Sequence, residues 1–276
     1  MVSQEQRRRQ LAREKFLRQQ QRRTQARRKA NVRNSVIASV LGVIVIGSVT
    51  LYTTGVLKGD DKKANAAADV TPSATPTSKA PDPCGKPAAG SVEKMSWKKE
   101  PAMTIDTSAK YSMKLATTCG DIDVALKTAA APHTVNSFNF LAGKGYFDHT
   151  KCHRLTTTGI YVLQCGDPQG TGMGGPGYTL PDENLKDKSL KSNTYPAGTV
   201  AMANTGQKHT GGSQFFLVYK DSPLPPSYTP FGTVSEAGMK VLQKIAAAGA
   251  QAADPTSGNT APNATVVINK ATVTKS

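Results

Sequence analysis

The polar residues of this chain do not fit a common covalent or metal-dependent mechanism. Ser213 lies in the run Gly212–Phe215, which lacks the second glycine of a nucleophile elbow, so we do not expect serine hydrolysis. The four histidines and four cysteines form no C-x-x-C pair, so no zinc site is predicted. The run Gly170–Gly175 fits the dinucleotide pattern G-x-G-x-x-G, but Pro176 and Gly177 exclude the helix that this pattern requires. We therefore expect no metal and no cofactor.

Short motifs in a fixed order indicate a different chemistry. They are His153-Arg154, Val162–Asp167, Gly174–Tyr178, Ala201–Asn204, Gly212–Phe216 and Tyr228–Gly232. Together they resemble the cyclophilins, a family of peptidyl-prolyl cis-trans isomerases, over roughly Ser112 to Val273. Several motifs in one order are far more specific than any single motif, so chance similarity is a remote explanation.

The reaction that this resemblance implies needs no nucleophile. Rotation about an Xaa-Pro amide must break resonance across a barrier of about 18–20 kcal/mol, and unaided it takes tens of seconds or more. Reaching milliseconds requires roughly 7 kcal/mol of selective transition-state stabilisation. The task calls for an apolar slot for the proline ring, anchors for the flanking backbone, and a donor aimed at the prolyl nitrogen.

The resemblance also assigns these roles to residues. Arg154 matches the family's catalytic arginine, and a guanidinium suits the task because it stays charged and presents several donors in a fixed fork. Tyr228 stands where many relatives carry histidine, and its hydroxyl could still reach the substrate. The proline slot would be lined by Tyr161, Val162, Phe216, Leu224 and Phe231, and the peptide backbone would be bound by Gln164, Ala203, Asn204 and Gln214.

Two departures from the family pattern affect these predictions. The segment Leu155–Leu163 is slightly longer than in most relatives, so the assignment of Tyr161 and Val162 allows a shift by one residue. Pro223 replaces the tryptophan that many eukaryotic members place just before Leu224. For that reason we expect weak cyclosporin binding with catalysis retained.

The elements that must position these residues are predicted from periodicity. Alternating apolar residues on both sides of the turn at 118–121 predict a β-hairpin over residues 111–126. Further short strands are predicted at His153–Leu155, Tyr161–Gln164, Thr199–Ala203, Phe215–Tyr219 and Thr265–Ile268.

Two helices are predicted beside these strands. Pro132–Leu141 has proline at a helix start and apolar residues at helical spacing. Ser235 would cap a second helix that places Met239, Leu242 and Ile245 on one face. Many short strands with two helices favour a closed β-barrel whose ends are covered by helices. With the resemblance, the expected fold is mainly β, a closed eight-stranded cyclophilin-like barrel capped by two helices.

Charge and hydropathy are unevenly distributed along the 276 residues. Residues 1–34 hold twelve Lys and Arg against two Glu, which supplies +10 of the net charge of +16. Residues 35–57 carry no charge, and a helix of this length spans roughly 34 Å, enough for a hydrocarbon core of about 30 Å. We predict one transmembrane helix over 35–57, with a buried core helix or a cleaved signal peptide as alternatives. The positive-inside bias would keep residues 1–34 in the cytoplasm and export the rest.

The exported part is predicted to contain a linker and one domain. Residues 58–107 are rich in Ala, Pro, Ser, Thr and Lys and should have little regular structure, and the isomerase domain would occupy 108–276. Outside the cytoplasm disulfides persist, and four cysteines allow three pairings. We favour Cys152–Cys165, at the outer ends of two strands joined by a short loop, which leaves Cys84–Cys119. Free thiols are the alternative.

These observations support one leading function and two alternatives. The leading hypothesis is an isomerase, held at the cell membrane by one helix, that acts on proline-containing polypeptides and assists the folding of exported proteins. A non-catalytic scaffold would hold the same peptides without turnover, but it would not require Arg154. In the third hypothesis the basic tail binds anionic lipid or nucleic acid. We expect no nucleic-acid partner for the chain's main role.

Overall fold

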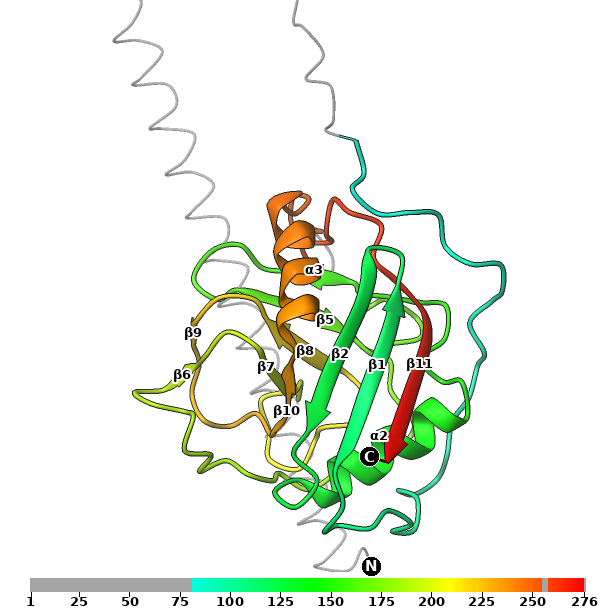
Figure 1. Ribbon diagram of the computed structural model, residues 1–276, viewed down its shortest axis with the longest axis vertical. Helices are drawn as coiled ribbons and strands as arrows, with labels where there is room; N and C mark the ends of the chain where they lie inside the picture. The colour runs from blue at the N-terminus through cyan, green and yellow to red at the C-terminus, as the bar shows by residue number, and fades with distance from the viewer. Residues whose placement is uncertain (1–80, 255–257, 276) are drawn as a thin grey trace, which may run out of the picture. The chain divides into compact units, whose positions relative to one another are not determined.

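The fold is mainly β in the computed structural model, which describes residues 81–254 and 258–275. In this part of the chain a 9-stranded antiparallel sheet curls around the core, a 2-stranded sheet lies beside it, and two helices pack on the outside (Figure 1). The prediction of a mainly β fold with two helices is therefore confirmed. The predicted basic tail (1–34), transmembrane helix (35–57) and first part of the linker (58–80) lie outside the described residues.

The two edge strands of the large sheet come from one continuous segment of the chain. Its order is β3-β11-β1-β2-β10-β7-β8-β5-β4, and β6 pairs with β9 in the small sheet. The bounds are β1 (Tyr111–Thr117), β2 (Gly120–Leu126), β3 (Thr150–Lys151), β4 (Arg154–Leu155), β5 (Val162–Cys165), β6 (Thr194–Tyr195), β7 (Thr199–Met202), β8 (Phe215–Val218), β9 (Ser222–Pro223), β10 (Pro230–Val234) and β11 (Val267–Lys275). The sheet has nine strands where the sequence predicted eight, because Cys152 and His153 divide one segment into β3 and β4.

The predicted hairpin is formed by β1 and β2, which pair along their whole length. Residues alternate between the two faces because successive side chains of a strand point in opposite directions. Met113 and Leu115 of β1 and Ile122 and Val124 of β2 are buried in the core. The hairpin thus supplies one wall of the curled sheet.

The two predicted helices cover the sheet at different places (Figure 1). Helix α2 (Pro132–Gly143) begins with proline, whose missing N–H costs nothing there, and packs against β11. Helix α3 (Glu236–Ala247) is capped by Ser235, whose hydroxyl accepts a hydrogen bond from the Gly238 N–H at 3.1 Å. Its buried residues include Leu242 and Ile245, and it packs against β2.

An aromatic cluster joins α2 to the sheet. The ring of Phe138 lies 5.2 Å from Phe147, 5.4 Å from Phe215 and 4.6 Å from Phe231, measured between ring centroids. All four side chains are fully buried. Aromatic pairs at such distances contribute to stability beyond their buried area, so this cluster anchors the helix to β8 and β10.

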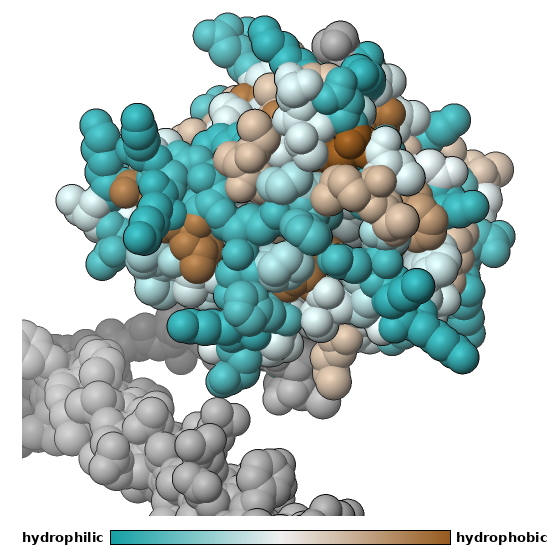
Figure 2. All heavy atoms as spheres, turned by 90° about the horizontal axis from the view of Figure 1, so that it is seen from below, coloured by the Kyte–Doolittle hydropathy of each residue, from teal (hydrophilic) through white to brown (hydrophobic). Residues whose placement is uncertain are grey.

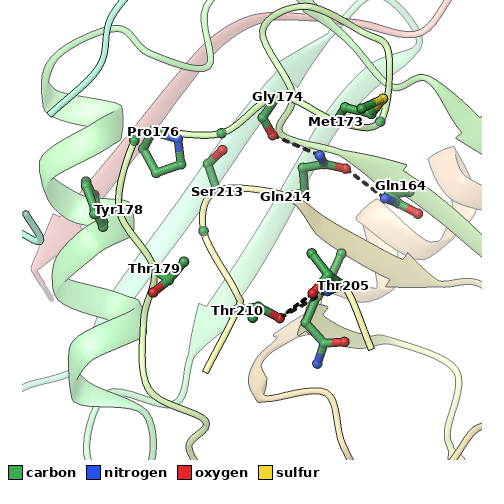
Figure 3. Close-up of a pocket in the computed structure, with 16 residues that line it drawn as sticks. Gln164, Met173, Gly174, Pro176, Tyr178, Thr179, Thr205, Thr210, Ser213 and Gln214 are labelled. Atoms are coloured by element: carbon green, nitrogen blue, oxygen red, sulfur yellow. Dashed lines mark hydrogen bonds between the residues drawn. The ribbon is translucent and has the colours of Figure 1, made fainter. Parts of the chain in front are cut away.

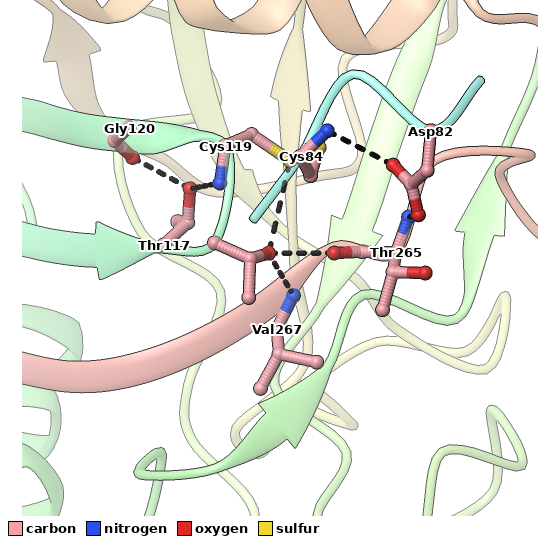
Figure 4. The surroundings of a disulfide bond; sticks show 8 residues. Asp82, Cys84, Thr117, Cys119, Gly120, Thr265 and Val267 are labelled. Carbon is pink, nitrogen blue, oxygen red and sulfur yellow. Dashed lines mark hydrogen bonds between the residues drawn. A yellow bond between two sulfur atoms is a disulfide. The ribbon is translucent and has the colours of Figure 1, made fainter. Parts of the chain in front are cut away.

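Residues 81–107, which we call the strap, contain no helix or strand but pack along the folded body. Cys84 is disulfide-bonded to Cys119 in the turn between β1 and β2 (Figure 4). Beside this bridge the Gly85 N–H donates a hydrogen bond to the Thr118 carbonyl oxygen at 2.8 Å. The packed body therefore includes the strap, which the sequence assigned to the linker.

The surface of the described body is mixed in character. In Figure 2 hydrophilic residues surround small, separate hydrophobic patches on the face in view. Within residues 81–254 and 258–275, no helix combines the length and the apolar character that crossing a bilayer would need.

Candidate active site

A small apolar cavity of about 110 Å³ opens where β4, β5 and β8 meet the loops after β7 and β9. Its walls include Val162 and Phe216, which belong to a hydrophobic cluster separate from the main core. A concave site with apolar walls and a few polar groups at its rim suits a small aliphatic ring. The lining residues are Arg154, Ile160, Val162, Gln164, Ala203, Asn204, Phe216, Leu224 and Tyr228.

The period of β5 decides which residues of this segment face the cavity. Val162 and Gln164 line it two residues apart, as expected for residues on one face of a strand, and Ile160 lines it from the bend before β5. Tyr161 has the opposite parity and does not line it, in contrast to its predicted role. Its ring lies 5.9 Å from that of Tyr219 instead.

Phe231 also does not line the cavity, although the resemblance placed it in the proline slot. It is fully buried and packs on Phe138 in the main core. At the next residue, Gly232, a Cβ would lie 2.6 Å from the Val124 side chain, so β10 lies close against β2.

Tyr195 is a supporting residue that the sequence motifs did not indicate. It is fully buried, and its ring lies 6.2 Å from those of Phe216 and Tyr228. Its hydroxyl donates to the Tyr228 carbonyl oxygen at 2.7 Å and accepts from the Tyr228 N–H at 3.1 Å. Burial raises the pKa of Tyr195 to about 12, so the hydroxyl keeps its proton and this donor. Tyr195 therefore holds the backbone of the cavity-lining Tyr228.

Arg154 begins a chain of side-chain hydrogen bonds. Arg154 stands opposite Gln164 in the β4–β5 register, and its Nη1 donates to Gln164 Oε1 at 3.2 Å. Gln164 Nε2 donates to Gln214 Oε1 at 2.9 Å, and Gln214 Nε2 donates to the Gly174 carbonyl oxygen at 2.9 Å (Figure 3). Hydrogen bonds oriented in one direction polarise one another, so this chain fixes the guanidinium while using one of its five donors.

Arg154 carries the only guanidinium in the part of the chain that the structure describes. Arg154 is the only arginine after Arg33. Burial lowers the pKa of its guanidinium, and the nearby Tyr228 raises it. An arginine starts from a pKa above about 12, so the side chain remains a cation at neutral pH.

The rim of the cavity presents backbone and amide groups. The Ala203 N–H donates to the Gln214 carbonyl oxygen at 2.9 Å. Asn204 Nδ2 donates to the Ser227 carbonyl oxygen at 2.8 Å, and its Oδ1 accepts from the Gly206 N–H at 3.0 Å. These bonds hold the predicted backbone-binding residues Ala203 and Asn204 beside the cavity.

A second, larger cavity of about 590 Å³ adjoins the first (Figure 3). The two share Gln164, Ala203 and Asn204, so they form neighbouring parts of one site. The predicted residue Gln214 lines the larger cavity rather than the smaller one. The loop Gly172–Thr179 forms one of its walls.

A buried carboxylate organises this glycine-rich loop. Asp167 accepts hydrogen bonds from the backbone N–H groups of Gln169, Thr171, Gly172 and Gly174 at 2.7–3.1 Å. Burial raises the pKa of Asp167, but these bonds lower it more, so the net pKa lies below its ordinary value. The loop is thus built around an anion of the protein itself and not around a bound phosphate.

The favoured disulfide pairing is confirmed. Cys152 bonds to Cys165, and Cys84 bonds to Cys119. Cys152 lies two residues before Arg154, and Cys165 directly follows Gln164. The bridge between Cys152 and Cys165 therefore joins the end of β5 to the segment just before β4, and these two strands carry the start of the hydrogen-bond chain. Among the described residues no group of three or more His, Cys, Asp or Glu is arranged to hold a metal ion.

Comparison with known proteins gives consistent relatives. The family model "Cyclophilin type peptidyl-prolyl cis-trans isomerase/CLD" matches residues 112–273. The "Probable peptidyl-prolyl cis-trans isomerase B" of Mycobacterium leprae is 48% identical over 149 residues, which cover 51% of this chain and 50% of that protein. The "Peptidyl-prolyl cis-trans isomerase B" of Bacillus subtilis is 43% identical over 115 residues, which cover 41% of this chain and 76% of that protein.

Two further facts complete the comparison. The chain spans about half the length of the mycobacterial relatives that it matches. A solved cyclophilin-type isomerase of Cryptosporidium parvum aligns with 60% of this chain and 99% of its own, with 26% sequence identity and a TM-score of 0.48.

Proposed function

This chain belongs to the family of cyclophilin-type peptidyl-prolyl cis-trans isomerases, and we propose that it catalyses rotation about the Xaa-Pro bonds of polypeptides. The observation that carries the proposal is the position of Arg154 at the rim of an apolar cavity of about 110 Å³. A cation in this place is hard to explain by packing alone, because charged groups are seldom placed beside apolar walls without a task.

The geometry supports a mechanism without covalent chemistry. The proline ring would enter the cavity between Val162, Phe216 and Leu224. As the amide twists, resonance is lost and the lone pair of the prolyl nitrogen becomes a hydrogen-bond acceptor. The donors of Arg154 that Gln164 does not use would bind this lone pair more strongly in the twisted state than in either planar state. Such differential binding lowers the barrier.

An isomerisation assay that uses no protease, for example NMR exchange measurements on a proline-containing peptide, tests the proposal with the full chain. Removing one preorganised donor commonly costs about 10²–10³ in rate, so Arg154→Ala should lower kcat/KM by roughly that factor. Arg154→Lys keeps the charge but loses the fork, and should recover only part of the loss. Lys220→Ala is the matched control, because Lys220 is a cation that contacts the Tyr161 ring outside the cavity.

The same assay separates the isomerase from a proline-binding scaffold. A parent chain that binds the peptide but leaves its exchange rate at the uncatalysed value would support the scaffold and contradict the isomerase. Equal turnover by the parent and Arg154→Ala would contradict the role given to Arg154.

We also propose that the isomerase is held at the cell membrane and acts outside the cytoplasm on proteins that fold after export. Support comes from the uncharged segment 35–57 behind the basic residues 1–34, and from two disulfides, which persist mainly outside the cytoplasm. A reporter fused after residue 276 that works only in the cytoplasm would contradict this. Cyclosporin should bind weakly, because Pro223 precedes the cavity-lining Leu224.

We propose, finally, that Thr150–Leu155 acts as one strand and closes the sheet into an eight-stranded barrel. In addition to its pairings with β11 and β5, its Cys152 N–H donates to the Val266 carbonyl oxygen at 3.0 Å and its Leu155 N–H donates to the Thr260 carbonyl oxygen at 2.7 Å. These two amides should exchange with solvent as slowly as those of β1. Fast exchange at both would indicate an open edge.

A further inference from the structure

The strap touches the loop that walls the larger cavity. The Trp97 N–H donates a hydrogen bond to the Pro176 carbonyl oxygen at 2.8 Å. The next residue, Gly177, has φ +89°, and a Cβ there would lie 2.6 Å from the Trp97 carbonyl oxygen and would overlap the Ser96 side chain. Strap and loop therefore meet backbone to backbone, with no room between them.

The indole of Trp97 also supports the site from a second direction. Its ring lies 5.1 Å from that of Phe140 and 5.9 Å from that of Tyr146. The Ser213 hydroxyl donates to the Gly166 carbonyl oxygen at 2.7 Å, so the buried Tyr146 hydroxyl is the donor in its 3.1 Å bond to Ser213. Ser213 is a lining residue of the larger cavity.

Elsewhere the outer side of the loop is open. A separate cavity of about 270 Å³ lies between the strap residues Lys94–Ser96 and the loop residues Pro168, Gln169 and Gly175. Space on this side leaves the loop room to move outward. The Trp97 contact limits that movement at Pro176, beside the bonds that tie Gly172 and Gly174 to Asp167.

We infer that Trp97 is a positioning residue that sets the width of the larger cavity and thereby the binding of substrate residues that flank the Xaa-Pro pair. This inference rests on the proposed isomerase function. The loop that Trp97 holds carries the Gly174 carbonyl oxygen, which accepts the hydrogen bond from Gln214. Without the indole the strap loses its packing on Phe140 and Tyr146, so its backbone bond to Pro176 would loosen and release both the cavity wall and this end of the hydrogen-bond chain. The proline slot keeps its own lining residues.

Substrate length provides the kinetic test in the full chain. For Trp97→Ala, the KM of a peptide that extends on both sides of the Xaa-Pro pair should rise about tenfold with little change in kcat. A blocked Ala-Pro dipeptide lacks these flanking residues, so Trp97→Ala should turn it over at a rate within about twofold of the parent. Met103→Ala is the matched control, because Met103 is an exposed apolar side chain of the same strap. Equal losses on both substrates would overturn the inference.

A second readout does not depend on activity. The NMR signals of the Gln214 side-chain amide and of the loop amides near Gly177 should shift in Trp97→Ala and stay in place in Met103→Ala. Unchanged signals in Trp97→Ala would overturn the inference, whether or not the parent chain is active. An inactive parent chain would contradict only the proposed function. If Trp97→Ala does not fold, Trp97→Phe, which keeps a smaller ring at this position, serves as the second variant. Its NMR signals should shift in the same direction by smaller amounts, and unchanged signals would also overturn the inference.

Discussion

Replacing both Cys152 and Cys165 by alanine should destabilise the folded body by about 3 kcal/mol. The bridge closes a loop with a sequence separation of 13, and the chain-entropy estimate for a loop of this size is about 3 kcal/mol. Both cysteines are buried, so alanine is preferable to serine, which would bury an unpaired hydroxyl. Typical domains have a free energy of unfolding of only about 5–15 kcal/mol. The variant should therefore still fold, but with a much smaller free energy of unfolding.

The second bridge provides the matched control. Cys84 and Cys119 are separated by 35 residues, for which the same estimate is about 4 kcal/mol. If loop entropy dominates, the variant Cys84→Ala with Cys119→Ala should lose slightly more stability than the variant at Cys152 and Cys165.

Thermal and urea unfolding, each followed by circular dichroism and by the fluorescence of Trp97, measure the effect. Trp97 is the only tryptophan and lies in the strap, so its fluorescence reports on strap docking. A loss of 3 kcal/mol should lower Tm by about 6–12 °C in a body of this size. The two probes should coincide without the Cys152–Cys165 bridge, whereas fluorescence should change first without the Cys84–Cys119 bridge.

A loss below about 1 kcal/mol for the variant at Cys152 and Cys165 would refute the loop-entropy reasoning. Activity is the second criterion. Neither sulfur lines either of the two cavities, so kcat/KM at a temperature where the variant is folded should change little. A large loss of activity with small loss of stability would mean that the bridge positions Arg154.

Three further predictions concern single residues. Gly166→Ala should lower the free energy of unfolding, measured in urea, by about 2 kcal/mol or more, because Gly166 has φ +90° and a Cβ would meet neighbouring backbone at 3.0 Å or less. Gly143→Ala is the control and should not lower it, because a Cβ at Gly143 would meet no atom within 4 Å. Burial lowers the pKa of His153, so the unfolded state binds a proton at a higher pH than the folded state does. The free energy of unfolding should therefore fall as the pH drops below about 6.5. If the free energy of unfolding of His153→Gln depends on pH as steeply as that of the parent, this reasoning is wrong. Tyr195→Phe removes both hydrogen bonds to the Tyr228 backbone and should lower kcat/KM by a factor equivalent to about 1–2 kcal/mol, while unchanged kinetics would show that the loop needs no such support.

Local patterns were sufficient for the elements whose contacts are close in sequence. The hairpin at 111–126 was predicted because alternation and a turn specify it without distant partners. Helix α3 was predicted for the same reason, from its cap at Ser235 and its apolar spacing. The bridge between Cys152 and Cys165 followed from neighbouring strands joined by a short loop.

Strand β10 shows where local patterns fail. Pro230 and Gly232 are typical of turns, and no strand was predicted there. In the structure Gly232 lies between β2 and β7, where a Cβ would meet Val124 at 2.6 Å. The glycine thus serves close packing between strands, which depends on residues far away in the sequence.

The sequence by itself determined the family, the helices and the hairpin, because these depend on motif order and short-range periodicity. Only the tertiary structure decided which side chains face the cavity. Pairing with β8 sets the register of β5, so Val162 and Gln164 face the cavity, and the bend before β5 adds Ile160 while Tyr161 does not line it. The docking of Trp97 could not be predicted from the sequence either, because its partners come from segments more than forty residues away along the chain.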